Sequence, residues 1–135
     1  MTGYSGTPLP KKLGIKEGLT VGIIGESPPG FALEGLPPGT QIHHRLKPSD
    51  IFLIFATASP AIEDLFHQAM KQIPVEGAIW VAWPKKSSRV ATDLTEDTMR
   101  DLFLSTGMVD NKVCAIDETW SGLRFVVRKE NRPDW

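Results

Sequence analysis

The chain has 135 residues, of which 41% are hydrophobic and 23% are charged, and its formal net charge is −1. This composition is that of one globular domain spanning residues 1–135, and the balanced charge disfavours nucleic acid as a partner. The longest apolar run, residues 51–58, is too short to cross a bilayer, so no membrane partner is expected. The first eight residues lack the basic and apolar regions of a signal peptide, and a single cysteine, Cys114, suits a reducing cytoplasm.

The first third of the chain predicts two strands joined by turns. Residues 8–18 indicate a short helical turn ending in glycines, which together with the preceding residues forms an N-terminal arm over residues 1–18. Residues 19–25 are apolar and predict a buried strand. A Ser-Pro-Pro-Gly turn follows at residues 27–30, and residues 31–36 can form at most one or two helical turns. Residues 41–46 predict a weaker strand near a sheet edge.

The middle of the chain predicts a strand–helix–strand unit. Residues 50–58 are almost wholly apolar, which is typical of a central parallel strand buried on both faces. Ser59 is predicted as the N-cap of a helix with Pro60 at its first position. The apolar positions then recur at helical spacing until Pro74. Residues 78–83 predict the next buried strand.

The last third predicts a helix and a hairpin. Thr95 is placed to cap the helix, and Gly107 to end it. Residues 112–120 and 123–129 predict two antiparallel strands about a two-residue turn at 121–122. The whole order predicts an α/β, Rossmann-like fold, with a mostly parallel sheet of about six strands and a C-terminal antiparallel hairpin.

Two resemblances accompany this pattern. Residues 12–25 (Lys-Leu-Gly-Ile-Lys-Glu-Gly-Leu-Thr-Val-Gly-Ile-Ile-Gly) resemble the entry to the first strand of class I methyltransferases, which use S-adenosylmethionine. Four motifs more closely resemble a family of small bacterial proteins that form a domain of unknown function: residues 3–8, 80–86, 92–95 and 117–123. The resemblances cover most of the chain. They imply a reduced methyltransferase-like topology and no particular activity.

The cofactor loop of methyltransferases is altered in this sequence. The family resemblance implies a glycine-rich loop that leads into a full helix, and an acidic residue about twenty positions further on that holds the ribose. Here the loop at residues 25–30 contains two prolines, which lack a backbone N–H, and residues 43–47 are basic. The connection is also short enough to lack a whole strand–helix unit. We therefore expect no tight binding of S-adenosylmethionine and assign no cofactor.

A cluster of polar residues follows the strand at residues 78–83. Trp83, Lys85, Lys86, Ser87 and Ser88 favour either an anion subsite with an aromatic wall or a solvated loop with a tryptophan over the core. Both interpretations stay open. His43 and His44 are neighbours in a strand and point to opposite faces, so they do not indicate a shared metal.

The predicted hairpin brings a second group to the same edge. A turn at 121–122 pairs Trp120 with Leu123 and places Glu118 on an otherwise apolar face. Asp117 then shares the other face with Arg124 and Arg128, as an ordinary surface ion pair. Trp120 is expected to lie beside Trp83 and the two lysines.

The carboxyl ends of parallel strands meet at one sheet edge, where ligands bind in α/β folds. The predicted ligand or partner surface consists of Glu26, Ser27, Thr57, Trp83, Lys85, Lys86, Ser87, Glu118 and Trp120. The leading hypothesis is a non-enzymatic binding or interaction module for a small anion or a protein. The alternative is a small enzyme, either a divergent methyltransferase or one acting on a nucleotide-like anion, with Glu118 or Glu26 as base. A homo-oligomer formed through the terminal hairpin is a third hypothesis, and no catalytic or metal-binding set is assigned.

Overall fold

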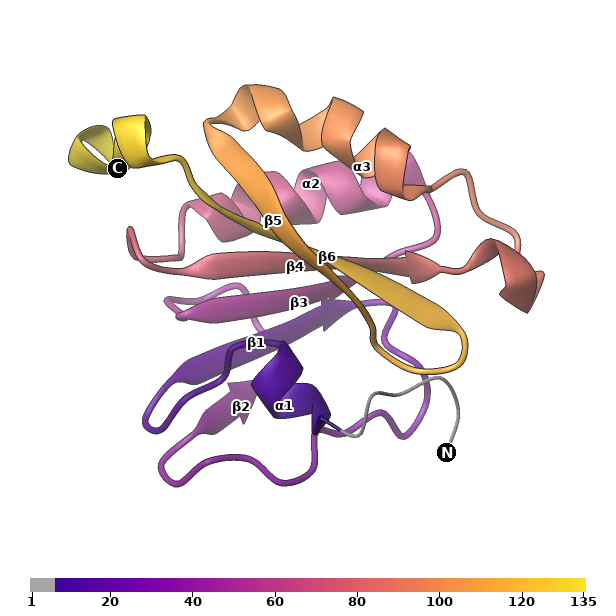
Figure 1. Cartoon of the computed structure of the whole chain (residues 1–135), viewed down its shortest axis with the longest axis horizontal. Coiled ribbons are helices and arrows are strands. Elements are labelled where there is room, and N and C mark those ends of the chain that lie inside the picture. The colour runs from indigo at the N-terminus through magenta and orange to yellow at the C-terminus, as the bar shows by residue number, and fades with distance from the viewer. Residues whose placement is uncertain (1–6) are drawn as a thin grey trace.

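A six-stranded mixed sheet organises residues 7–135, the part of the chain that the computed structural model describes (Figure 1). Its strands are β1 (Thr20–Gly25), β2 (Gln41–His43), β3 (Ile51–Phe55), β4 (Ala78–Pro84), β5 (Met108–Ala115) and β6 (Trp120–Val127), in the order β2-β1-β3-β4-β6-β5. The first four strands are parallel, and β6 runs antiparallel to both β4 and β5. The predicted Rossmann-like class with an antiparallel C-terminal hairpin is confirmed. Residues 1–6, which hold most of the motif at 3–8 and part of the predicted arm, lie outside the described residues.

The two central strands carry the most apolar sequences. Every residue of β3 and of β4 is buried, because layers of side chains cover both faces of the sheet there. The polar strand β2 lies at the sheet edge and has three residues, in line with its weaker pattern.

Helices α2 (Ser59–Met70) and α3 (Glu96–Phe103) cover one face of the sheet (Figure 1). Phe66 of α2 stacks on Phe103 of α3 at 3.9 Å between ring centroids, and both rings meet the edge of Phe125 in β6. Thr95 caps α3 by accepting a hydrogen bond from the Thr98 N–H at 3.1 Å, as predicted. We call this side the helical face.

The opposite face has a thinner cover. It packs against the short helix α1 (Leu9–Lys12) and the irregular segment at residues 31–36, and we call it the α1 face. The indole N–H of Trp80 donates to the Leu13 carbonyl at 3.0 Å and fixes the end of α1 to β4. No helix forms over residues 31–36, where two prolines follow directly. The connections β1–β2 and β2–β3 therefore both lack a helix, which matches the predicted shortening of this region.

The hairpin turn is the main correction to the predicted fold. Residues 121 and 122 lie inside β6, and the chain reverses at residues 116–119, where the Ile116 N–H donates to the Trp120 carbonyl at 2.9 Å. This position of the strand requires a glycine, because a Cβ on residue 122 would meet Ile116 at 2.9 Å and Trp80 at 3.2 Å. The predicted turn at residues 121–122 is therefore wrong, because Gly122 permits close packing within a strand.

Ser59 is the second correction. The N-cap position of α2 is Ala58, and Ser59 is already helical. The Asp93 carboxylate replaces a side-chain cap by accepting bonds from the Ser59 N–H at 3.0 Å and from its hydroxyl at 2.6 Å. The hydrogen bond from the Ser59 hydroxyl lowers the pKa of Asp93.

Candidate functional site

The carboxyl ends of β1, β3 and β4 lie along one edge of the sheet, and the hairpin turn reaches the same edge. The Lys85 N–H donates to the Thr119 carbonyl at 2.7 Å, so the residues after β4 contact the start of β6 directly. The predicted convergence of these segments is thus present. The side chains, however, separate into several groups.

Glu26 and Thr57 form the first group, at the ends of β1 and β3. The Glu26 carboxylate accepts from the Thr57 N–H at 3.0 Å and from its hydroxyl at 3.1 Å. The Thr92 hydroxyl donates to the Thr57 carbonyl at 2.6 Å. Glu26 therefore joins the ends of β1 and β3, and its carboxylate accepts hydrogen bonds from groups of the protein itself. Ser27 lies beside this group and is partly buried.

The two tryptophans do not form a common pocket wall. Trp83 packs in the cluster on the helical face, whereas Trp120 packs in the cluster on the α1 face, where its ring meets Phe55 at 5.1 Å. Both side chains are more than nine-tenths buried. The expectation that Trp120 lies beside Trp83 and the lysines is wrong. The predicted turn put Trp120 on the same face as Leu123. In the structure both residues belong to β6, three positions apart, so their side chains lie on opposite faces.

The shifted turn also changes the carboxylates of the hairpin. Asp117 accepts from the Thr119 and Trp120 N–H groups at 2.8 and 2.7 Å, so it shapes the turn instead of pairing with Arg124 or Arg128. Glu118 is exposed in the turn and does not share an apolar face with β6 residues.

Lys85 and Lys86 border a pocket of about 530 Å³ on the helical face. Arg89 joins the two lysines, and we call the site the cationic pocket. Its apolar lining comes from Trp83, Pro84, Val90, Ala91 and Leu94, and the hydroxyls of Thr92, Thr95 and Ser121 also border it. Ser87 is exposed in the short 3-10 helix η1 (Lys86–Ser88) and does not line the pocket.

Backbone hydrogen bonds fix the turn that carries the three cations. The N–H and the hydroxyl of Ser88 both donate to the Lys85 carbonyl, at 3.0 and 2.6 Å, and the Arg89 N–H donates to the Lys86 carbonyl at 3.2 Å. Arg89 has a φ of 63°, the only positive φ of a non-glycine residue in the described chain. Such a backbone geometry is disfavoured for side chains that carry a Cβ and is concentrated at functional positions.

The charges of the pocket are unbalanced. Within residues 7–135, no ion pair joins Lys85, Lys86 or Arg89 to a carboxylate. The one carboxylate in the lining, Glu96, is paired with Arg100, which also binds Asp110 at 3.0 Å. These bonds to Asp110 and Glu96 raise the pKa of Arg100. Three cations thus surround one hollow with little opposing charge.

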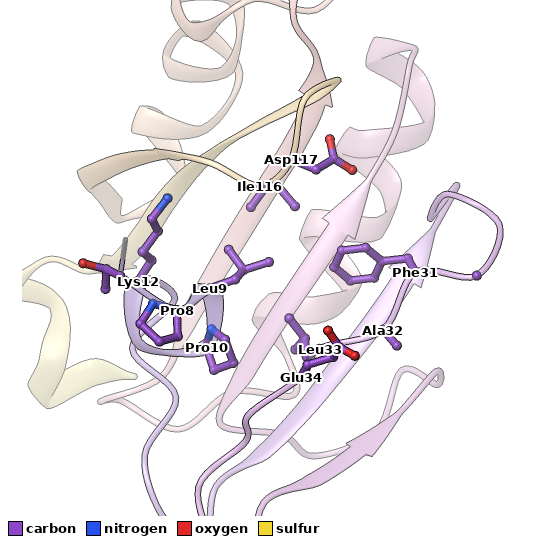
Figure 2. A pocket seen from close by; sticks show the side chains of 12 residues that line it. Pro8, Leu9, Pro10, Lys12, Phe31, Ala32, Leu33, Glu34, Ile116 and Asp117 are labelled. Carbon is purple, nitrogen blue, oxygen red and sulfur yellow. The ribbon is translucent and has the colours of Figure 1, made fainter. Parts of the chain in front are cut away.

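A second pocket of about 580 Å³ lies on the α1 face, between α1, residues 30–34 and the hairpin turn (Figure 2). Figure 2 shows Leu9, Phe31 and Ile116 around it. Its charged lining combines Lys12 with Glu34 and Asp117, so opposite charges are mixed there. Thr7, the first residue that the structure describes, also lines this pocket. This pocket suits a small anion less well than the cationic pocket.

His43 has structural hydrogen-bond partners, and Cys114 lies in surroundings that do not activate a thiol. The Arg45 N–H donates to Nδ1 of His43 at 3.1 Å, so Nε2 carries the proton and donates to the Ser49 hydroxyl at 2.6 Å. Burial, followed by the charge of Lys47, lowers the pKa of His43. Burial raises the pKa of the Cys114 thiol, which disfavours a nucleophilic thiolate. No three His, Cys, Asp or Glu side chains gather in a metal-binding arrangement within residues 7–135.

Comparisons with solved structures give the fold a family context. The chain is similar to a SAM-dependent methyltransferase from Aquifex aeolicus, with a TM-score of 0.60, 15% identity and 87% of each chain covered. It is also similar to precorrin-6y C5,15-methyltransferase from Geobacter metallireducens, with a TM-score of 0.54, 10% identity, and 89% and 86% of the two chains covered. A third is the B. subtilis m1A22 tRNA methyltransferase TrmK, with a TM-score of 0.52, 10% identity, and 93% and 67% covered. No family model and no curated protein matches the chain.

The protein has a methyltransferase-like fold. At identities of 10–15%, these similarities establish the architecture alone.

The residues at the end of β1 do not fit S-adenosylmethionine in the manner that the family resemblance implies. No helix follows β1, and Phe31 folds back onto Phe55 at 5.0 Å between ring centroids. The Glu26 carboxylate is bound to Thr57, and β2 is followed by His44 and Arg45 instead of an acidic residue. His44 itself bonds through Nδ1 to the Ile23 carbonyl at 2.9 Å. This edge therefore lacks both the open loop and the ribose acid.

Proposed function

We propose that this protein is a binding module that takes a small anionic ligand in the cationic pocket. The observation that carries the proposal is the group formed by Lys85, Lys86 and Arg89, which has no paired carboxylate within residues 7–135. Unpaired cations carried close together on one short turn repel one another, and a bound anion relieves that repulsion. Arginine and lysine are also the side chains that bind phosphate and carboxylate most strongly.

The position of the pocket supports the same function. It lies where β4 ends, and ligands in open α/β sheets bind outside the carboxyl ends of strands. Its volume of about 530 Å³ falls in the size range of small-molecule sites. We assign binding and orientation to this pocket, because its three cations lie along the lining and its one carboxylate, Glu96, is paired with Arg100.

Titration calorimetry with inorganic phosphate tests this proposal. The wild-type protein should bind phosphate, and Lys85→Glu with Lys86→Glu should abolish binding. A matched pair of reversals at exposed lysines outside the pocket, Lys16→Glu with Lys129→Glu, should retain it. Equal binding by both double variants, or none by the wild type, contradicts the proposal.

A divergent methyltransferase is the second candidate function, and the observation that favours it is the similarity to three solved methyltransferases. The edge formed by Glu26, Phe31 and His44 argues against the usual cofactor placement. We expect calorimetry with S-adenosylmethionine to give no micromolar binding. Micromolar affinity, lost when Glu26 is replaced by lysine, would favour the methyltransferase over the binding module.

We further propose that the protein works in a bacterial cytoplasm. The motifs shared with small bacterial proteins and the single cysteine support this setting. The longest helix, α2, has 12 residues, and no helix within residues 7–135 has the length and apolarity needed to span a bilayer. Fractionation of cells that express a tagged protein tests the location.

A further inference from the structure

We infer that the ligand of the cationic pocket is a phosphate monoester that carries an apolar group. This inference rests on the proposed function and adds two properties to it: the charge of the ligand head and the nature of its body. The two properties come from different parts of the pocket lining.

The number of cations points to a dianionic head. Lys85 and Lys86 carry compact charges, and Arg89 offers a planar fork of donors. A phosphate monoester has a second pKa of about 6 and so carries close to two charges at neutral pH, with three acceptor oxygens. A carboxylate carries a single charge and two oxygens. Three cations against the single paired carboxylate of Glu96 match the dianion better.

The apolar lining points to a body beyond the phosphate. Val90 follows Arg89 directly and leaves 44% of its surface exposed, which makes it one of four large exposed hydrophobic residues in the described chain. Trp83 and Leu94 also line the pocket and are almost fully buried. Exposed apolar surface beside fixed cations is suited to a ligand that is charged at one end and apolar at the other.

The wall that carries Val90 is anchored to the sheet. The Thr92 hydroxyl donates to the Thr57 carbonyl and accepts from the Leu94 N–H at 3.1 Å, and Asp93 holds the first turn of α2 through Ser59. Residues 92–94 therefore connect the pocket to β3 and α2. A preformed wall lowers the entropic cost of binding, because less of the protein has to become ordered around the ligand.

The test compares four probes by calorimetry: inorganic phosphate, phenyl phosphate, benzoate and phenol. Phenyl phosphate should bind at least tenfold more tightly than inorganic phosphate, a difference of about 1.4 kcal/mol. It should also bind more tightly than benzoate, which has the ring but one charge, and phenol should not bind detectably. Val90→Ser should remove most of the advantage of phenyl phosphate over phosphate. Val113→Ser, at an exposed valine of the edge strand β5, should leave that advantage unchanged.

Each outcome separates this inference from the proposed function. Equal affinity for phosphate and phenyl phosphate overturns the inference and leaves the proposed anion site intact. Benzoate that binds as tightly as phenyl phosphate overturns the assignment of a dianionic head. An advantage that survives Val90→Ser places the apolar group elsewhere and also overturns the inference. If none of the anions binds, the proposed function fails and the inference fails with it.

Discussion

Replacing Phe66 by alanine should destabilise the protein strongly. Phe66 is fully buried on the helical face, stacked on Phe103 at 3.9 Å and set against the edge of Phe125 at 5.5 Å between centroids. Truncation of a buried phenylalanine costs about 3–5 kcal/mol. Each aromatic pair adds about 0.5–1.5 kcal/mol beyond the buried area, so the upper part of that range is expected.

Urea denaturation followed by circular dichroism measures this change, with the slope of the free energy against urea checked for constancy. His67→Ala provides a matched control, because His67 is the next residue of α2 and is exposed. The control should change the free energy of unfolding by less than about 0.5 kcal/mol. A loss below about 1 kcal/mol for Phe66→Ala would show that the cavity and contact argument is wrong at this position.

Three further predictions concern single positions. The pKa of His43 is lowered in the folded protein by burial and by the charge of Lys47, so the unfolded chain binds a proton first as the pH falls. Stability should then decrease below about pH 6.5, the ordinary pKa of histidine, in pH-dependent denaturation, and His43→Asn should reduce that slope. An unchanged slope in His43→Asn would contradict this assignment. Gly25 and Gly30 both have positive φ, but a Cβ at Gly25 would collide with a carbonyl of β3 and a Cβ at Gly30 would meet nothing. Gly30→Ala should cost about 1–2 kcal/mol and Gly25→Ala clearly more; equal losses would refute the steric argument. Thr95→Ala removes the cap of α3 and should cost about 1 kcal/mol in thermal or urea denaturation, and no measurable loss would contradict the assignment of that cap.

The buried parallel strands could be predicted from the sequence because their signal is local. Residues 50–58 and 78–83 are apolar without interruption, and the strands β3 and β4 are buried throughout. A strand that is buried on both faces does not need to alternate polar and apolar residues. An uninterrupted apolar run of this length therefore indicates a central parallel strand. The cap at Thr95 could be predicted for the same reason, because its hydrogen bond joins residues only three positions apart.

The hairpin could not be placed from sequence because its determinants act across strands. Gly122 is required by Ile116 and by Trp80, a neighbour forty-two positions earlier in the chain. The real turn depends on the Asp117 carboxylate, which binds two N–H groups of its own loop. Placing the turn at residues 121–122 also shifts the predicted pairing of β5 with β6 by an odd number of residues. Side chains alternate between the two faces of a strand, so this shift assigns Trp120 to the wrong face.

The position of the residues that border the cationic pocket could be predicted in part, because only some of its determinants are local in sequence. Lys85 and Lys86 follow a strong strand directly, so their place at the carboxyl edge was readable from the sequence. Arg89 was missed, because its contribution depends on a left-handed backbone that only the turn after Lys86–Ser88 produces. Glu26 was identified as a site residue, but its bonds to Thr57 join segments thirty-one positions apart and carry a structural role.

The most direct test of the cationic pocket is a phosphate titration of the ¹⁵N-labelled protein followed by heteronuclear NMR. The account predicts saturable shifts of the backbone amides of residues 85–96, which surround Lys85, Lys86 and Arg89. Amides of residues 9–12 and 30–34, beside the second pocket, should stay unchanged. Shifts confined to the second pocket, or a linear drift spread over the whole chain without saturation, would contradict the assignment of the anion site.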